Sequence, residues 1–335
     1  KTTRTTNGGT NWTTQRQGAI ALYGISLISP NNVTVVGDYG TVLRTTDFGI
    51  TWIDQSKGTI NDLYDICFTD SNHGCVVGGN GTILITFNGG VTWDIQQVAY
   101  NVSGVNYIDS NFGTIVGRDN SLNGMILMTT DGGSNWSSQS EGRPYNAVFF
   151  SDSNNGTIVG DEIRRTTNGG NTWTLQRYIV NESLNDVYFI DTNTGVVVGR
   201  DVTSFLGIIL RTTNGGITWT SQYSGTISGF IKVLFIDSQN GVVIGDGKLL
   251  RTIDGGLTWN EQPSNYTQPL TSVFFTDINN GTAVGYLGTI LSTIDGGATW
   301  TVKPSRTPVV FSEVIFSDSM NGWIIGQWGT ILHTT

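Results

Sequence analysis

The segment Thr45-Thr46-Asp47-Phe48-Gly49-Ile50-Thr51-Trp52 decides the fold, because its pattern recurs along the whole chain. Each copy has Thr, then Asp or Asn, then Gly and a final Trp at the same spacing. The eight copies end at Trp12, Trp52, Trp93, Trp136, Trp173, Trp219, Trp259 and Trp300. Successive tryptophans are 40, 41, 43, 37, 46, 40 and 41 residues apart. A sequence period of this length predicts a fold built from repeated structural units.

A second pattern between these turns predicts the content of one repeat. In Asp186–Gly199 an apolar stretch, an Asp-rich turn and a second apolar stretch follow one another. A glycine turn then leads to a third stretch, such as Gly288–Thr293, and the Asn-Gly or Asp-Gly turn leads to the Trp-bearing fourth. Such turns between apolar segments are strong hairpin signals. Each repeat is therefore predicted to be a four-stranded antiparallel propeller blade.

The ends of the chain predict how the propeller closes. Arg4–Thr6 and Ile331–Thr335 both have the pattern of a third strand, so the last repeat lacks a fourth strand. The segment Thr10–Gln15 could supply it and so remove two free strand edges. We predict an all-β propeller, most simply of eight blades, that forms a single domain over residues 1–335. Seven blades with one stray repeat, and a fragment of a longer array, remain alternatives.

Composition narrows the possible functions of the chain. It has 45 glycines, 13% charged residues and a net charge of −9, with only 17 Lys and Arg. Nucleic-acid binding needs clustered basic residues, so no nucleic-acid partner is expected. No apolar run is long enough to span a membrane, so no membrane insertion is expected either. Cys67 and Cys75 flank one predicted hairpin turn, and a disulfide between them stays open.

The Trp-bearing segments resemble the Asp-box, also called the bacterial neuraminidase repeat. Four copies keep the aspartate and the others carry Asn. The resemblance implies a structural role, in which Asp or Asn caps the turn and Trp packs between strands. The residues assigned to it are the eight tryptophans together with Asp47, Asp131, Asp254 and Asp295.

The flanking pattern Gly288–Leu291 narrows the resemblance further. It is similar to photosystem II assembly factor-like repeat proteins, which many bacteria secrete. The resemblance implies a secreted or cell-surface location in bacteria. The many Ser, Thr and Asn residues and the few lysines favour the same location.

Catalytic signatures are weak in this sequence. Sialidases need an arginine triad and a Tyr–Glu pair, whereas the arginines here recur at one strand position, which indicates structure. Two histidines and two cysteines do not make a convincing metal set, so no metal and no cofactor are predicted. A non-catalytic protein is expected. A glycoside hydrolase that uses Asp161 and Asp246 is the alternative, because such hydrolysis needs only two carboxylates.

Irregular turns mark the predicted binding face, since function on a repeat protein concentrates where the repeat is broken. Two turns are lengthened, Arg118–Gly124 and Arg200–Gly207. Tyr, Trp and Arg are also favoured at recognition sites. The predicted binding residues are Arg118, Asp119, Arg200, Asp201, Tyr39, Arg143, Tyr145, Asp161, Asp246, Tyr286 and Trp328. We expect a scaffold that binds a protein or a glycan. A unit of a surface layer or filament is a further alternative, and the oligomeric state stays open.

Overall fold

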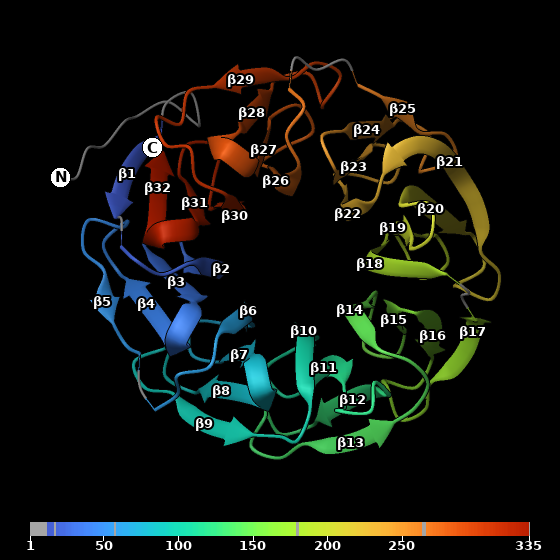
Figure 1. The fold of residues 1–335 in the computed structure, drawn as a ribbon. Helices are drawn as coiled ribbons and strands as arrows, with labels where there is room; N and C mark the ends of the chain where they lie inside the picture. The colour runs from blue at the N-terminus through green and yellow to red at the C-terminus, as the bar shows by residue number, and fades with distance from the viewer. Residues whose placement is uncertain (1–11, 17, 57, 179–180, 263–265, 335) are drawn as a thin grey trace. The chain divides into compact units, whose positions relative to one another are not determined.

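Eight antiparallel sheets of four strands each make up the structure, a computed structural model. It describes residues 12–16, 18–56, 58–178, 181–262 and 266–334. No α-helix occurs in these ranges. The fold is therefore an eight-bladed all-β propeller, as the sequence predicted, and the seven-bladed alternative is wrong (Figure 1). The chain divides into two compact units, and each is described on its own.

The first unit comprises Lys1–Val98 and Pro263–Thr335 and holds four blades. Their strands, in hydrogen-bonded order, are β2 (Leu22–Ser29), β3 (Asn32–Gly37), β4 (Thr41–Thr45) and β5 (Ile53–Asp54); β6 (Leu63–Phe68), β7 (Gly74–Gly78), β8 (Thr82–Thr86) and β9 (Asp94–Gln97); β26 (Leu270–Phe275), β27 (Gly281–Gly285), β28 (Ile290–Thr293) and β29 (Thr301–Lys303); and β30 (Phe311–Phe316), β31 (Gly322–Gly326), β32 (Thr330–Thr334) and β1 (Thr13–Arg16). The first strands β26, β30, β2 and β6 contact one another in that order. Short 3-10 turns follow the second strand of each blade: η1 (Asp38–Gly40), η2 (Gly79–Gly81), η3 (Tyr286–Gly288) and η4 (Gln327–Gly329).

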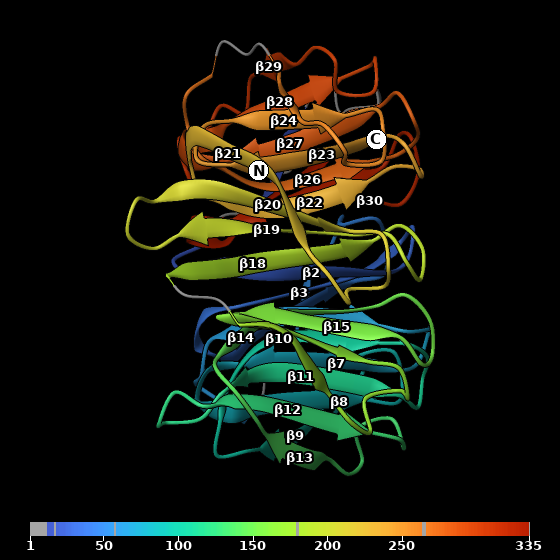
Figure 2. The same cartoon turned by 90° about the vertical axis from the view of Figure 1, so that its right-hand side faces the viewer.

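The second unit, Ala99–Gln262, holds the other four blades. Their strands are β10 (Asn101–Tyr107), β11 (Gly113–Arg118), β12 (Gly124–Thr129) and β13 (Ser137–Ser140); β14 (Tyr145–Phe150), β15 (Gly156–Gly160), β16 (Glu162–Thr166) and β17 (Thr174–Tyr178); β18 (Glu182–Phe189), β19 (Gly195–Asp201), β20 (Leu206–Thr212) and β21 (Thr220–Ser228); and β22 (Phe230–Phe235), β23 (Gly241–Gly245), β24 (Leu249–Thr252) and β25 (Asn260–Glu261). Figure 2 shows β18, β19 and β20 lying side by side within one blade. The first strands β10, β14, β18 and β22 contact one another in sequence.

The N-terminal strand completes the last blade, as predicted. β1 pairs with β32, with Thr13 opposite His333 and Thr14 opposite Leu332. Trp12 packs edge-on against Phe316 of the same blade, with ring centroids 5.6 Å apart. The third-strand residues Arg4–Thr6 and the start of Thr10–Gln15 lie outside the described residues.

In seven of the eight blades, an aromatic residue at the end of the first strand packs against the Trp. Phe275 and Trp300 are representative, with ring centroids 5.9 Å apart and planes at 88°. The second strand then begins with Gly281, and a Cβ there would lie 2.7 Å from the Phe275 ring. Seven blades share this arrangement of Phe or Tyr, Gly and Trp. The glycine is therefore required by the aromatic side chain that covers it.

The one blade that lacks this arrangement supports the explanation. In the blade β2–β5 the aromatic residue is replaced by Leu27, and its register partner is Val33 instead of glycine. Val33 is fully buried in a cluster that also contains Leu27 and Trp52. The smaller first-strand side chain leaves space for the larger second-strand one, so the pair conserves the volume of the site.

The repeated arginine position ties neighbouring blades together within a unit. Arg211 donates from Nε to the carbonyl of Gly255, at 2.8 Å, in the Trp-bearing turn of the next blade. Arg165 donates to the carbonyl of Thr192, also in the next blade, at 3.3 Å. These contacts agree with the structural role that the sequence assigned to the arginines.

The Trp-bearing turns are closed by Asp or Asn, as the sequence predicted. Asp254 accepts hydrogen bonds from the backbone N–H of Thr258 at 2.9 Å and from the hydroxyls of Thr252 and Thr258. Burial, the largest single effect, favours the neutral acid. The hydrogen bonds together outweigh it and hold the pKa of Asp254 below its ordinary value. Where the turn has Asn, as in Asn214, the amide nitrogen donates to the threonine hydroxyl instead.

The two cysteines lie directly opposite each other in one blade. Cys67 of β6 is the register partner of Cys75 of β7, and Cys75 is fully buried.

We predict that Gly281→Val destabilises the fold by about 1–3 kcal/mol, because the new side chain would overlap the Phe275 ring. Adding Phe275→Leu reproduces the pair found in the blade β2–β5 and should recover much of the loss. Denaturant unfolding of both single variants and the double variant measures the coupling. Additive losses would contradict the explanation.

We also predict an acid-sensitive contribution from the turns. A carboxyl whose pKa is lowered on folding stabilises the protein above its unfolded pKa of about 4, and this stabilisation is lost as pH falls through the folded pKa. Asp47, Asp254 and Asp295 all have lowered pKa values. Replacing the three with Asn should flatten the fall in Tm between about pH 5 and pH 3. A variant with the slope of the parent protein would refute this account.

Candidate functional site

The second unit carries a face on which turn lengths alternate. Residues 119–123 separate β11 from β12, only Asp161 separates β15 from β16, and residues 202–205 separate β19 from β20. A short turn is therefore flanked on each side by a long one. Each of these turns connects the second strand of a blade to the third. All three turns therefore lie at the same end of their blades. We call this surface the turn face of the second unit.

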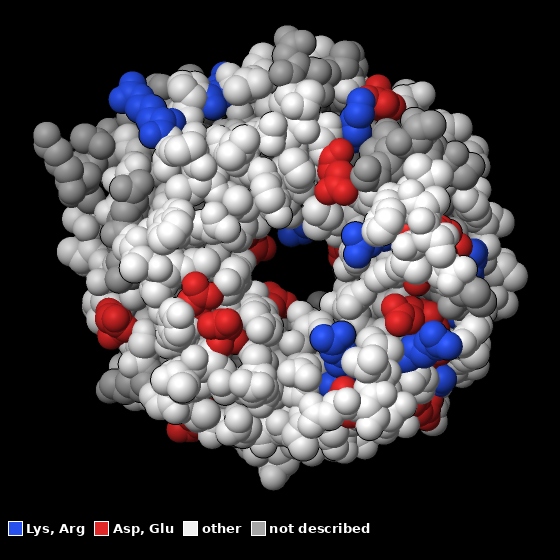
Figure 3. Space-filling model, in the orientation of Figure 1, with Lys and Arg blue, Asp and Glu red and all other residues white. Residues whose placement is uncertain are grey.

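Basic side chains gather around the short turn. Arg118 and Arg143 are exposed and both act electrostatically on Asp161, which is partly buried. Burial raises the pKa of Asp161 above its ordinary value, although the two arginines act in the opposite direction. Figure 3 shows basic and acidic side chains interspersed over this unit. The structure thus brings together three of the predicted site residues.

Two arginines lie over aromatic rings. The Arg143 guanidinium is 5.0 Å from the centroid of the Tyr178 ring, and that of Arg200 is 5.8 Å from the centroid of Phe205. Tyr178 and Phe205 are exposed, and neither was among the predicted site residues. Phe205 lies at positive φ, as does Leu122 at the corresponding place in the other long turn. Each long turn thus combines an arginine with an exposed apolar residue.

The two predicted carboxylates of the long turns shape those turns. Asp119 accepts hydrogen bonds from the backbone of Ser121 and Asn123, each at 2.8 Å. Asp201 accepts hydrogen bonds from Thr203 and Ser204, and these lower its pKa to about 2. Both carboxylates therefore close their turns, and the turn itself occupies their oxygens.

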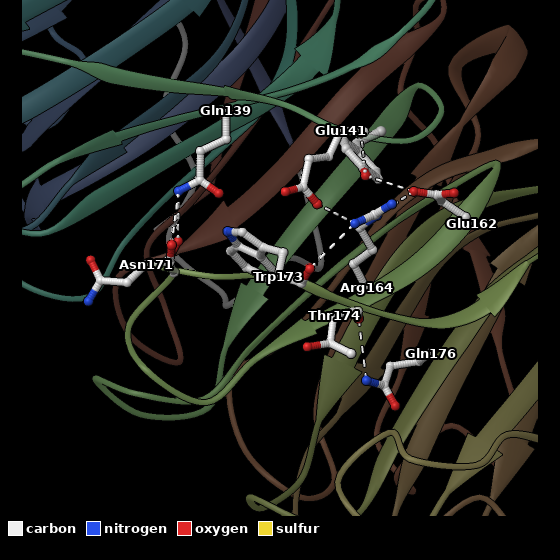
Figure 4. A network of polar contacts seen from close by, with 10 residues as sticks. Gln139, Glu141, Glu162, Arg164, Asn171, Trp173, Thr174 and Gln176 are labelled. Atoms are coloured by element: carbon white, nitrogen blue, oxygen red, sulfur yellow. Dashed lines mark hydrogen bonds and ion pairs between the residues drawn. The ribbon is translucent and has the colours of Figure 1, made fainter.

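A buried ion-pair network lies beneath the short turn (Figure 4). Glu162 is 2% exposed and accepts hydrogen bonds from Nε of Arg164 at 2.6 Å and from the Tyr145 hydroxyl at 2.9 Å. Arg164 also pairs with Glu141 and donates to the carbonyl of Trp173. The sequence analysis missed this network. The sequence feature that could have predicted it is the shortened turn, which brings Glu162 to the start of β16.

Tyr145 requires a correction as a binding residue. It is only 1% exposed, and its hydroxyl donates to the carbonyl of Glu141 as well as to Glu162. Its position begins the first strand, which is buried in the core in other blades, as Leu184 is. Tyr145 therefore supports the site from below and cannot contact a partner directly.

The remaining predicted residues lie elsewhere. Tyr39, Tyr286 and Trp328 belong to η1, η3 and η4 of the first unit and are exposed. Asp246 is exposed in the turn between β23 and β24, and the whole blade β18–β21 separates it from Asp161 along the unit. Glycosidase carboxyls lie about 5–10 Å apart. Asp161 and Asp246 stand in blades that are not neighbours in the unit.

No group of three or more His, Cys, Asp or Glu side chains suited to a metal ion occurs within the described part of the chain. In the same part, no helix is long and apolar enough to cross a membrane.

The comparison with protein families and the comparison with solved structures agree with each other. The family described as Photosynthesis system II assembly factor YCF48 matches residues 56–144 and 264–335, just under half of the chain. YCF48 from Cyanidioschyzon merolae has a TM-score of 0.67 at 19% identity, over 96% of this chain and 98% of that one. The chain is similar to YCF48. None of the curated protein sequences matches it.

Two further solved structures share the fold. "YCF48 bound to D1 peptide" has a TM-score of 0.63 at 22% identity, over 82% of this chain and 92% of that one. The GH74 xyloglucanase from Xanthomonas campestris has a TM-score of 0.61 at 11% identity, over 95% of this chain and 60% of that one. At these identities the likeness shows the fold alone.

The predicted secreted or cell-surface location is wrong. The matching family and two of the similar structures are YCF48, an assembly factor of photosystem II by its description, and this contradicts an extracellular role. The physical reason lies in the turns. Thr and Asn side chains, such as Thr252 and Asn214, form the hydrogen bonds that close them. The abundance of these residues therefore reflects turn chemistry and carries no information about export.

We predict that Arg164→Met destabilises the protein by about 3–5 kcal/mol, because it leaves the buried Glu162 carboxylate without its ion-pair partner. The double variant Glu162→Gln and Arg164→Met removes both charges and should be markedly more stable than the single variant. Thermal and denaturant unfolding provide the measurement. A double variant no more stable than Arg164→Met would argue against the network.

Proposed function

We propose that the chain is a non-catalytic scaffold whose turn face in the second unit binds an extended, acidic segment of a partner polypeptide. The observation that carries the proposal is the short turn between two long turns, each with an exposed arginine. A protein-binding role is also supported by the similar YCF48 structure, whose title names a bound D1 peptide.

The arginines are suited to recognition because their positions are fixed in advance. Arg143 and Arg200 lie over aromatic rings, and Asp119 and Asp201 fix the turns in which the neighbouring arginines stand. An arginine whose side chain is held in place loses less conformational entropy on binding. Its guanidinium fork can then donate two parallel hydrogen bonds to a carboxylate. Two arginines held in this way, together with the exposed Arg118, favour an acidic segment over a neutral one.

A polypeptide fits this face better than a glycan. Sugar-binding sites use aromatic faces that are free to stack on the ligand. Here Tyr178 and Phe205 are each covered by an arginine. The exposed side chain of Leu122 in the other long turn instead suits contact with an apolar side chain of a peptide.

We predict that Arg118→Gln with Arg200→Gln weakens binding of an acidic peptide at least tenfold, because each lost charge-assisted hydrogen bond is worth about 1.5–3 kcal/mol. Asp161→Asn should strengthen binding, since it removes a carboxylate that competes for Arg118 and Arg143. Calorimetric titration with the D1 peptide and with a polyglutamate peptide measures both effects.

Lys303→Gln of the outermost strand β29 is the matched control, because it removes a cation from a strand of the first unit. Tm should stay within about 2 °C of the parent in each surface variant, since surface substitutions usually cost under about 0.5 kcal/mol. Equal affinity of the parent and the double arginine variant for both peptides would rule out this face.

A further inference from the structure

A backbone bulge in the first strand of each blade offers a comparison between the repeats. The register shifts by one residue near the start of the strand, so one side chain there is left opposite no partner. In three blades this bulge residue ties its strand to the neighbouring blade of the same unit. Asn146 donates to the carbonyl of Leu184 at 2.8 Å, and Asn185 donates to that of Phe230 at 2.7 Å. Thr271 donates to the carbonyl of Phe311 at 2.7 Å.

Two adjacent blades of the first unit have tyrosine at the bulge position. Tyr23 follows Leu22 in β2, and Tyr64 follows Leu63 in β6, with the same register shift as elsewhere. The two rings are 6.1 Å apart, and both are partly exposed. Blades with Asn or Thr at the bulge position form the same strand pairing. The fold therefore does not require tyrosine at this position.

Two carboxylates lie beside the tyrosines. Asp38 accepts a hydrogen bond from the Tyr23 hydroxyl at 2.7 Å and another from the backbone N–H of Ala21 at 2.7 Å. Asp62 accepts one from the backbone N–H of Tyr39 at 3.0 Å. Burial raises the pKa of Tyr23, and Asp38 and Asp62 raise it further. The charged groups with the greatest effect on this tyrosine are thus both negative.

The exposed tip of η1 completes the surface. Tyr39 is 69% exposed, and its neighbour Ile60 is among the most exposed apolar residues of the described chain. We call Tyr23, Tyr39, Tyr64, Asp38 and Asp62 the tyrosine–aspartate surface. The Tyr23 and Tyr64 rings are tilted against each other at 59°, and both keep part of their surface exposed.

We propose that the tyrosine–aspartate surface binds an arginine side chain of a polypeptide partner. A guanidinium is planar, so it can stack on a tyrosine face while its edge donates hydrogen bonds to a carboxylate. Asp62 has a carboxylate oxygen in addition to the one that Tyr39 occupies. The site stands independently of the turn face of the second unit, and it has the opposite charge. The chain thus presents an anionic aromatic surface on one unit and a cationic one on the other.

The chemistry favours arginine over lysine. The ammonium group of lysine is more strongly hydrated and has no flat face to place against the tyrosines. Arginine gains both the stacking and the ion pair. We therefore expect discrimination between two side chains of equal charge, which electrostatic attraction alone would not provide.

The test uses the full chain and blocked five-residue glycine peptides that differ only in the central residue, which is arginine, citrulline or lysine. Citrulline keeps the shape of arginine and removes its charge. Ligand-detected NMR titration gives the relative Kd values. The arginine peptide should bind about tenfold more tightly than the citrulline peptide and severalfold more tightly than the lysine peptide, as expected for an ion pair combined with stacking.

Asp62→Asn and Tyr64→Ala should each weaken binding of the arginine peptide severalfold, because one removes the charge and the other removes a ring. Asp94→Asn on the exposed strand β9 is the matched control and should leave the Kd unchanged. Arg118→Gln with Arg200→Gln should also leave it unchanged, which separates this site from the turn face. Equal binding of the arginine and citrulline peptides, or no effect of Asp62→Asn, would overturn the proposal.

Discussion

The edge-to-face contact between an aromatic residue of the first strand and the Trp that follows the third is the interaction on which seven of the eight blades depend. It joins the inner and outer parts of one sheet through two large apolar side chains. The contact requires the second strand to begin with glycine, as at Gly281 beside Phe275. Where Leu27 stands in place of the aromatic residue, Val33 stands in place of the glycine. Sequence and packing therefore vary together from repeat to repeat, as a close-packed interior demands.

This packing leaves the turns at the other end of each blade free to differ. The turn between β15 and β16 is a single residue, whereas residues 119–123 form the corresponding turn of the preceding blade. The bulge residue is Asn185 in one blade and Tyr64 in another. Both proposed binding surfaces consist of such positions, at which the residue differs from blade to blade. A regular scaffold can therefore carry two surfaces of opposite charge without a change in its core.

The sequence was sufficient to predict the blades, because local turn chemistry and a constant period act together. The pairing of β1 with β32 was also predictable, since both chain ends had the pattern of a third strand. The site was only partly predictable. Arg118, Arg143 and Asp161 come together because their turns are adjacent in one unit, but nothing in the spacing shows that Tyr145 is buried beneath them. The stacking of Arg143 on Tyr178 depends on contacts between loops, which the repeat period does not encode. The predicted location was wrong because the Thr and Asn residues that favoured it serve to close the turns.

The pairing of β1 with β32 also has a consequence for biosynthesis. Thr13 bonds to a carbonyl 320 residues later in the chain. During translation at about 5–20 residues per second, the first strand must wait tens of seconds until its partner has left the ribosome. The intervening blades are built from local hairpins and can assemble meanwhile. The last sheet is therefore the final one to form, and until then its unpaired edges are exposed to other chains.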